Sequence, residues 1–454
     1  MQVGFLVAFG GRKALLTSFS LSAFALLLFV MASSTNSQAI PAFARKYGLP
    51  CSACHEAWPM LNVFGQTFKD NGYQLMNDRD SPIWQNPSFW PATFRITPNW
   101  HRESTNSVLV DTPAGQNTAQ TRITSNGFDL TGLDFHTGGT LYQNISFYVL
   151  PSSDPTGAFH FETAMARLDN LAKSPWLNFK LGKYELDNII SEKRILTLSN
   201  NGGIYRLYHF IPPGDSNIYG QMGDNQLGME LLGHSLNDRT RYSVSLLSSS
   251  DGTVLLPNRN AYSTFVTASQ AFDAGYQGGV DRVGAYYFGG VAPTFFINSG
   301  GVPILGVGNK PFSREGLFGL LYLKKLDFQV FYQHGWDSAY FGTSTAANAP
   351  LPVGARAPTW NGAFIETHYV VNPQLIFIQR SEIIRMSQQA IPGTDPRLGD
   401  IDAFTFAYRW YPIMFSRAGF AWHNEYAIVR QHGTAPLGGN LASSSLFFGF
   451  DFDF

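Results

Sequence analysis

The sequence has 454 residues, and 31 basic side chains nearly balance 32 acidic ones to give a formal net charge of -1. Charged residues make up 14% of the chain, aromatic residues make up 15%, and 44 residues are glycine. This composition gives no argument for nucleic-acid binding, which requires a basic surface.

Residues 1–39 have the pattern of a secretory signal peptide. A basic pair precedes an apolar run from Ala14 to Val30, and small and polar residues follow it. An uncleaved membrane anchor is the alternative, but hydroxyl residues interrupt the run and it is short for a membrane helix. We therefore expect an exported protein whose mature chain begins near Ile40.

The only two cysteines of the chain lie in a Cys-x-x-Cys-His run at residues 51–55. This pattern is typical of covalent haem c attachment, in which Cys51 and Cys54 form thioethers and His55 binds the iron axially. A redox dithiol would need a βαβ context, and a zinc site would need a second ligand pair. A plain disulfide would leave the following histidine unexplained. The run therefore predicts one covalent haem.

Residues 40–80 are expected to form a small helical cytochrome c segment around this run. Leu61, Phe64 and Phe68 recur at helical spacing, and Asn71-Gly72 is a helix stop signal. A segment of about 40 residues buries little core and cannot enclose a haem alone. Another part of the chain, or a partner, must complete the pocket.

The second axial iron ligand is less well defined by the sequence. Met76 follows the expected helix, so the chain can return across the other face of the porphyrin, and a His/Met pair raises the reduction potential. Met60 is the rival candidate, but it lies close behind His55 on the proximal side. Another donor or an open site are the remaining alternatives, since either methionine can simply pack against the haem.

Residues 91–454 show the period-two alternation of β-strands with one apolar face. Phe404, Phe406, Tyr408 and Trp410 alternate with smaller or polar residues, and apolar residues alternate from Leu446 to the terminal phenylalanine. In water such a strand would promote aggregation, whereas in a bilayer it faces lipid. A terminal phenylalanine also resembles the assembly signal of bacterial outer-membrane proteins.

Strand length and connections favour an outer-membrane barrel over a soluble sandwich. Strands of about ten residues are joined alternately by tight turns, such as Asn237-Asp238, and by long loops, such as 291–312 and 337–360. Roughly 360 residues at about 23 per strand and connection give about 16 antiparallel strands and a wide lumen. We expect residues 40–80 to plug that lumen or its mouth, with the haem near the outer face, and residues 81–90 to link plug and barrel.

The positions around the haem motif define a signature: Pro41, Phe43, Arg45, Tyr47-Gly48, Pro59, Leu61-Asn62, Phe64-Gly65, Phe68-Lys69 and Gly72-Tyr73. This signature resembles that of the fused monohaem cytochrome-porins, whose characterised members are outer-membrane Fe(II) oxidases. The resemblance implies that Cys51 and Cys54 anchor the haem, that His55 is its axial ligand, and that Phe43, Phe64 and Tyr73 frame its pocket.

The resemblance points to Fe(II) as the electron donor, and the barrel implies the other partners. Outer-membrane lipid would surround the barrel, Fe(II) or another extracellular donor would supply electrons at the outer face, and a periplasmic cytochrome or similar carrier would accept them. Related haem-bearing porins without demonstrated iron chemistry share the signature, so a solute-passing porin with a structural or sensory haem plug is the alternative. The acidic residues near the motif, Glu56, Asp70, Asp78 and Asp80, are interpreted as exposed, because carboxylates ordinarily are.

Overall fold

The computed structural model describes most of the barrel and much of the segment that precedes it. The described residues are 43, 46–57, 60–73, 75, 90–153, 157–192, 199, 201–210, 222–223, 225–248, 261–275, 280–297, 303–337, 359–388, 399–414 and 419–453. The expected signal peptide and the candidate ligand Met76 lie outside them.

The N-terminal segment contains α3 (Cys51–Cys54), β1 (His55–Ala57), β2 (Met60–Leu61) and α4 (Val63–Asp70). The first half of the barrel contains β3 (Ala92–Thr112), β4 (Gly115–Tyr142), β5 (Ile145–Ser153), β6 (Phe159–Leu168), the short 3-10 helix η1 (Leu171–Lys173), β7 (Asn178–Tyr184), β8 (Gln226–His234), β9 (Thr240–Ser248) and β10 (Tyr262–Phe272). The second half contains β11 (Asp281–Ile297), β12 (Pro303–Leu323), β13 (Leu326–Asp337), β14 (Thr359–Asn372), β15 (Leu375–Gln388), β16 (Ile401–Met414), β17 (Gly419–Gln431) and β18 (Leu441–Asp453).

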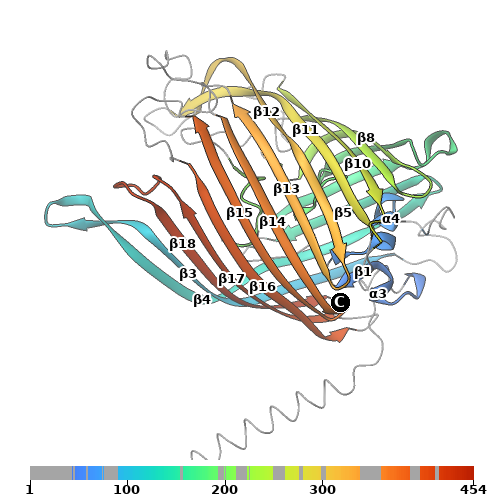
Figure 1. The fold of residues 1–454 in the computed structure, drawn as a ribbon, viewed down its shortest axis with the longest axis horizontal. Coiled ribbons are helices and arrows are strands. Elements are labelled where there is room, and N and C mark those ends of the chain that lie inside the picture. Colours follow the sequence, from blue (N-terminus) through green and yellow to red (C-terminus); the bar gives the residue numbers. More distant parts are fainter. Residues whose placement is uncertain are drawn as a thin grey trace, which may run out of the picture.

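Strands β3 to β18 form one closed barrel in which each strand pairs with its neighbours in sequence and β18 pairs with β3. All of these pairings are antiparallel, and Figure 1 shows the strands running obliquely around the wall. Closure leaves no open sheet edge around the ring. The prediction of an antiparallel barrel of about 16 strands is confirmed.

The alternation predicted for the strand faces is also observed. On β16, Phe404 and Phe406 are exposed on the outer face while Thr405 and Ala407 are buried inside. Along β18, Phe448 and Phe452 lie on the outer face. Large apolar side chains are likewise exposed on many other strands. An outer surface of this kind suits lipid rather than water.

The two ends of the barrel differ in their connections. Two-residue turns join β4 to β5, β12 to β13 and β14 to β15, all at the end where β3 begins and β18 finishes. Most connections at the other end are longer, and the β3–β4 hairpin, although its own turn has only two residues, extends beyond the wall there (Figure 1). In outer-membrane barrels short turns face the periplasm and long loops face outward. The loop expected at 291–312 is largely strand, because β11 and β12 pair out to Ile297 and Pro303.

The predicted helical plug is wrong in extent. Leu61 belongs to β2, and helix α4 covers only Val63–Asp70, because Asn62 provides its N-cap and Asn71 its C-cap. Among the described helices none is long and apolar enough to span a membrane. The segment lies at one end of the barrel, and a different part of the chain enters the lumen.

A stretch between β7 and β8 lies inside the barrel, and we call residues 185–192, 199 and 201–210 the lumen strap. Its apolar side chains, including Ile190, Tyr205 and Leu207, are buried against the inward faces of the barrel. Tyr205 stacks on Phe364 of β14 with ring centroids 4.4 Å apart. The core of the molecule is therefore inside the barrel.

Candidate functional site

The Cys-x-x-Cys-His run folds against the start of helix α4. The backbone N–H of Asn62 donates to the Cys54 carbonyl oxygen at 2.9 Å, and its side-chain amide donates to the Ala53 carbonyl at 3.0 Å. The Asn62 side chain also accepts from the backbone N–H of Gly65, which caps the helix. One asparagine thus joins the motif to α4.

Gly65 brings the two elements into close contact. A Cβ atom at this position would overlap the carbonyl oxygen of Cys54. Only glycine lets the helix approach so closely. This close contact explains sterically why the residue at position 65 is glycine.

The residues predicted to bind haem follow one another along α3 and β1. His55 is buried at 5% exposure in β1, and burial raises the pKa of the Cys54 thiol to about 11. Cys51 begins α3 and Met60 begins β2, but their side chains are outside the described part of the structure. A Cys54 thiol in a run with a buried His55 imidazole fits the chemistry of covalent haem attachment.

An aromatic cluster supports this segment and joins it to the wall. The Tyr73 ring stacks between Phe43, at 5.3 Å, and Tyr148 of β5, at 5.4 Å. Phe68 packs edge-on against both Phe43 and Tyr47. Two of the expected pocket residues, Phe43 and Tyr73, are therefore in contact. Phe64 lies on α4 and is half-buried.

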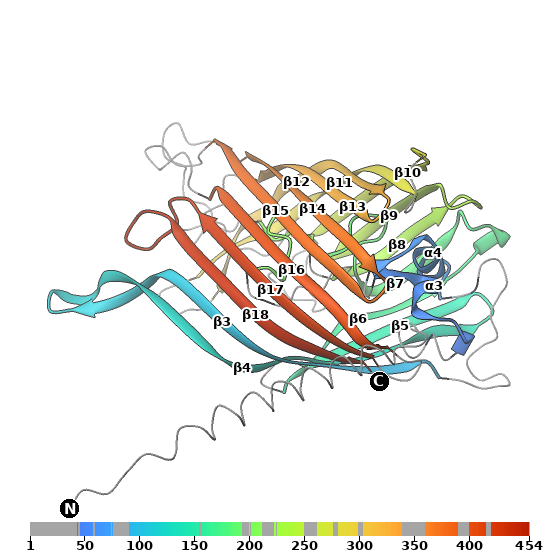
Figure 2. The same cartoon turned by 60° about the horizontal axis from the view of Figure 1, so that its bottom comes forward.

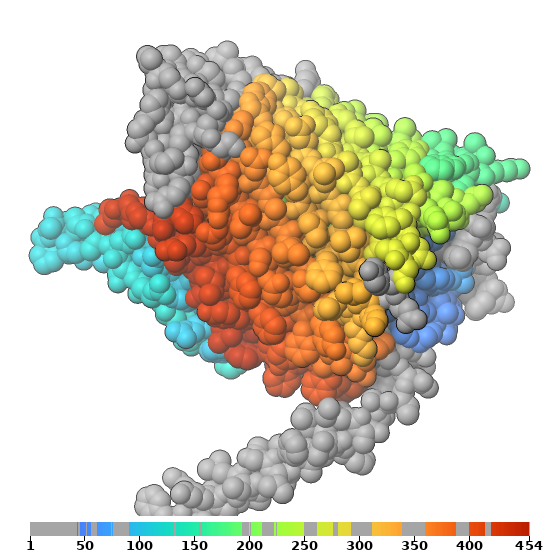
Figure 3. All heavy atoms as spheres, viewed as in Figure 1, coloured from blue at the N-terminus to red at the C-terminus, as the bar shows by residue number. Residues whose placement is uncertain are grey.

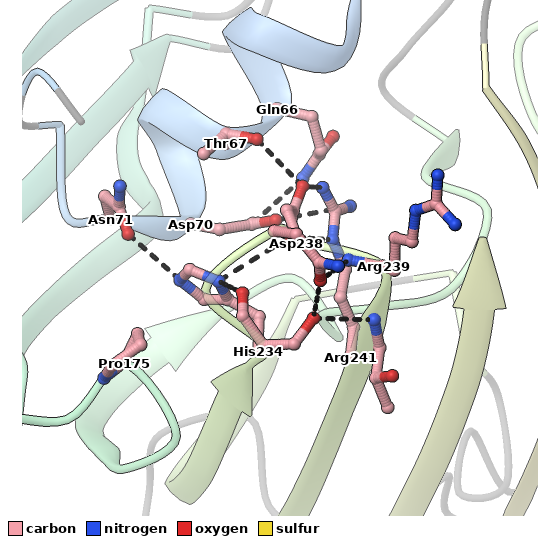
Figure 4. Close-up of polar contacts among 12 residues, drawn as sticks. Gln66, Thr67, Asp70, Asn71, Pro175, His234, Asp238, Arg239 and Arg241 are labelled. Carbon is pink, nitrogen blue, oxygen red and sulfur yellow. Dashed lines mark hydrogen bonds and ion pairs between the residues drawn. The ribbon is translucent and has the colours of Figure 1, made fainter. Parts of the chain in front are cut away.

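The C-terminal half of α4 is bound to the β8–β9 hairpin by a group of polar contacts that we call the latch (Figure 4). Asp70 Oδ2 lies 3.3 Å from Arg241 Nη1, and the Thr67 hydroxyl donates to Asp238 Oδ2 at 2.8 Å. Arg241 also pairs with Asp238, and His234 Nε2 lies 3.0 Å from Asn71 Oδ1. Asp70, interpreted from sequence as exposed, is instead buried at 6% exposure.

The latch also changes the acidity of one carboxyl group. Burial acts to raise the pKa of Asp238, but the hydrogen bond and positive charge of Arg241 outweigh burial and hold this pKa below its usual value. The Asp238 carboxylate is therefore charged over the neutral range. The latch thus pairs the buried carboxylates of Asp70 and Asp238 with the buried guanidinium group of Arg241.

A second group of contacts holds the residues that follow the helix. Arg167 of β6 donates to the Lys69 carbonyl at 3.4 Å, which places a cation at the negative C-terminal end of α4. Gly72 has φ +74°, and a Cβ there would meet the side chains of Ser146 and Asp169. The chain leaving α4 is therefore held against both β5 and β6.

These contacts place the segment at the short-turn end of the barrel. Figure 2 shows α3 and α4 beside the ends of β8 and β14, and Figure 3 shows the same segment, in blue, reaching the surface there. The short-turn end is periplasmic in outer-membrane barrels. The expectation of a motif near the outer face is therefore wrong, because the latch residues belong to the inner end of the wall.

The lumen strap is bound by charged groups on several strands. Glu382 of β15 accepts from the backbone N–H groups of Arg206 and Leu207 at 3.1 and 3.2 Å. Arg380 donates to the Ile204 carbonyl at 2.9 Å. Carboxylates and arginines thus satisfy the buried backbone of the strap, as burial requires.

The strap also reaches the opposite side of the barrel. The Asn201 amide donates to Ser445 of β18 at 2.6 Å and to Glu103 of β3 at 3.2 Å. Ser199 binds Glu425 of β17. The sequence alone did not reveal this element, although the apolar residues Leu186, Ile189 and Ile190 soon after a strand are a signal that could have found it.

Metal-binding side chains do not cluster elsewhere in the described residues, where no group of three or more histidine, cysteine, aspartate or glutamate side chains is arranged to hold an ion. Several buried histidines of the described wall pair with acids instead. His368 Nε2, for example, lies 2.9 Å from Glu366 Oε1. The motif at 51–55 is thus the site with the clearest cofactor chemistry.

The sequence matches no known protein-family profile and no curated protein. Among solved structures, the chain is similar to the anion-selective porin from Comamonas acidovorans, with 9% identity, a TM-score of 0.50, and coverage of 80% of this chain and 100% of the porin. The outer-membrane channel DcaP of Acinetobacter baumannii is similar at 9% identity and a TM-score of 0.47, covering 80% of this chain and 97% of the channel. Salmonella typhi OmpF is similar at 10% identity and a TM-score of 0.47, covering 78% and 96% respectively.

The fold and the outer surface together define the class of protein. A closed antiparallel barrel with an exposed apolar wall has the architecture of a bacterial outer-membrane porin. At such low identity, the similarity concerns the fold alone. The N-terminal segment and the lumen strap must be interpreted from their own residues.

Proposed function

We propose that this protein is an outer-membrane c-type cytochrome that passes electrons from an extracellular donor, Fe(II), to a carrier in the periplasm. The observation that carries the proposal is the Cys-x-x-Cys-His run, held by α4 and the latch at the inner end of a porin-like barrel. The position suits electron exit toward the periplasm, because a soluble carrier can reach that end.

The residues of the segment fit a covalent haem c. Cys51 and Cys54 would form the thioethers, and His55 would bind the iron; Met76 or Met60 is the proposed second ligand. When bound, haem c supplies one-electron chemistry at a potential set by its ligands and surroundings. Phe43, Phe64 and Tyr73 would exclude water from its edge, and the latch would fix its distance from the wall.

The lumen strap favours an electron conduit over an open pore. Barrels of this strand number ordinarily leave an aqueous channel. Here buried side chains of the strap pack on β10–β14, and polar contacts extend it to β17, β18 and β3. Packed protein blocks solutes while still supporting electron tunnelling over short distances. The donor would give up its electron at the outer side of the strap.

Two experiments test the proposal. Haem staining after denaturing electrophoresis should show covalent haem in the wild-type protein and none with Cys51→Ser. Anaerobic Fe(II) should then reduce the haem of the purified protein, as followed by its absorption spectrum. A protein without stained haem contradicts the cofactor assignment, and a stained protein that Fe(II) leaves oxidised contradicts the donor.

The second candidate function is a solute-passing porin whose haem segment is structural or sensory. The barrel fold favours it, since the similar Comamonas acidovorans protein is described as an anion-selective porin. Ion conductance in planar bilayers separates the two functions. A large, steady conductance together with a haem inert to Fe(II) would support the porin.

A further inference from the structure

The turns that surround the N-terminal segment carry an unbalanced set of exposed basic side chains, which we call the basic rim. Its members are Lys173 of η1, Arg239 of the β8–β9 turn, and Lys324 and Lys325 of the β12–β13 turn, and all four are exposed. Within the described part of the chain, none of the four forms an ion pair with a carboxylate.

These turns lie on three sides of the segment. The η1 turn follows Asp169, which borders Gly72, and the β8–β9 turn binds α4 through Asp238. On the third side β1, which begins with His55, lies beside β14, and the β12–β13 turn hydrogen-bonds to β14 through the Val370 N–H. The basic rim therefore borders the segment that carries the predicted haem motif on three sides.

The side chains of the rim point away from the buried charges beneath them. In Figure 4 the guanidinium group of Arg239 projects out of the latch, whereas Arg241, two residues later, enters it. Lys325 Nζ donates only to the Val371 carbonyl, and this bond is exposed. The rim is thus free to interact with a partner, whereas the latch is fully engaged within the chain.

Among the described turns at this end, the exposed carboxylate is that of Asp273 after β10, and it accepts from the backbone N–H of Gly275 at 2.8 Å. The four exposed cations thus outnumber the exposed carboxylates of these described turns, which favours a positive potential over this part of the mouth. Such a field raises the association rate of a negatively charged partner and orients its approach.

We propose that the basic rim is the docking surface for a soluble electron carrier with an acidic face. This inference rests on the proposed function, which requires a carrier at this end of the barrel. Docking there brings the carrier's redox centre toward the 51–55 motif. One electron then leaves the reduced haem and reduces the carrier's oxidised centre, so no other reactant is needed.

A lipid headgroup is the competing occupant, since basic turns of barrels can also contact anionic lipid. The arrangement favours the carrier, because the rim surrounds the segment on three sides of the mouth. Lipid contact alone would favour basic residues all around the barrel perimeter, whereas the β4–β5 and β14–β15 turns, Gln143-Asn144 and Pro373-Gln374, are uncharged. The test below therefore includes anionic vesicles as a separate probe.

The experiment uses the full-length protein in nanodiscs of zwitterionic lipid and one carrier in two charge states. The probes are a lysine-rich soluble monohaem cytochrome c and the same cytochrome after succinylation, which reverses its surface charge. Affinity is measured by surface plasmon resonance at several salt concentrations. Electron transfer is measured by stopped flow after dithionite reduction of the outer-membrane protein, so Fe(II) is not involved.

At low salt we expect the succinylated cytochrome to bind at least about ten times more tightly than the untreated one. This difference in affinity should be lost at high salt. The combined variant Lys173→Glu, Arg239→Glu, Lys324→Glu and Lys325→Glu should reverse this preference. The control variant Arg102→Glu with Arg122→Glu changes exposed cations of β3 and β4 away from the short-turn end and should bind like the wild type. Haem staining and heat-modifiability on gels verify that each variant is folded and loaded.

Equal binding of the two cytochromes, or an unchanged preference in the fourfold rim variant, would overturn the proposal. Binding of anionic vesicles through the rim without binding of the succinylated cytochrome would assign the surface to lipid instead, and would equally overturn it. Neither readout uses Fe(II). A haem that Fe(II) cannot reduce would therefore refute Fe(II) as the donor, whereas docking at the rim is decided by the binding measurement alone.

Discussion

Gly65 of α4 lies directly against the carbonyl oxygen of Cys54, so the helix and the predicted haem-attachment motif share a surface with no room for a side chain. Since the same turn is held by Asn62, the motif cannot move independently of α4. Through the latch, α4 is in turn fixed to the wall. This chain of contacts links the attachment site to the barrel.

Replacing Gly65 by alanine should separate the motif from the helix. The added methyl group overpacks the contact, and we expect a loss of about 2 kcal/mol in the stability of the segment and less covalent haem per protein. Haem stain normalised to protein measures the loss. Val63→Ala, at an exposed position of the same helix, is the control and should retain full staining. Full staining of the Gly65 variant would show that the contact is dispensable.

Replacing Arg241 by methionine should open the latch. The change leaves the buried carboxylates of Asp70 and Asp238 without their cation, and breaking such a pair costs about 3 kcal/mol. Hydrogen exchange of the α4 amides should accelerate accordingly, while amides of the barrel strands keep their protection. Arg239→Met, at the neighbouring exposed position, should leave exchange unchanged. Equal exchange in both variants would mean that the latch does not hold the helix.

The latch should weaken in acid. Because the pKa of Asp238 in the folded protein is below its unfolded value of about 3.9, folding favours the charged form. Its contribution is therefore complete above about pH 5 and is lost as the pH falls through the folded pKa. Exchange of α4 amides, corrected for intrinsic rates, should show a loss of protection below about pH 4. Asp238→Asn should remove this dependence, and an unchanged acid profile in that variant would assign the transition to another group.

The lumen strap should make the barrel a poor ion channel. We expect single-channel conductance about tenfold or more below that of an open barrel with the same strand number. Glu382→Ala removes the acceptor for the N–H groups of Arg206 and Leu207, so the strap should loosen and conductance should rise. Glu315→Ala, at an exposed position of β12, is the matched control. High conductance in the wild type would refute the closed lumen.

Period-two alternation was sufficient to predict the barrel, because the lipid-facing side of every strand must be apolar. The outward direction of Phe404 and Phe448 follows from that rule, and the number of strands follows from the chain length divided by the usual length of one strand with its connection. The lumen strap was not predicted because its apolar residues pack against the inside of the barrel and do not recur at a regular spacing. The burial of Asp70 was not predicted either, because its partner Arg241 is far away in sequence and a buried ion pair leaves no local sequence pattern.

The position of the motif could not be predicted for a related reason. A short plug can fit either end of a barrel, and the end is chosen by contacts such as Thr67 with Asp238 and Tyr73 with Tyr148. The proposal of a haem site, by contrast, rests on a local pattern, namely Cys51, Cys54 and His55 within five consecutive residues.

Directional electron transfer across a membrane tests the central claim most directly. The protein is reconstituted into liposomes that enclose an oxidised soluble cytochrome, populations are sorted by protease access to the β3–β4 hairpin, and Fe(II) is added outside. We predict that the enclosed cytochrome is reduced in liposomes whose long loops face outward, and that Cys51→Ser abolishes this reduction. Reduction at the same rate by the Cys51→Ser protein, or none in loaded wild-type liposomes, would contradict the account.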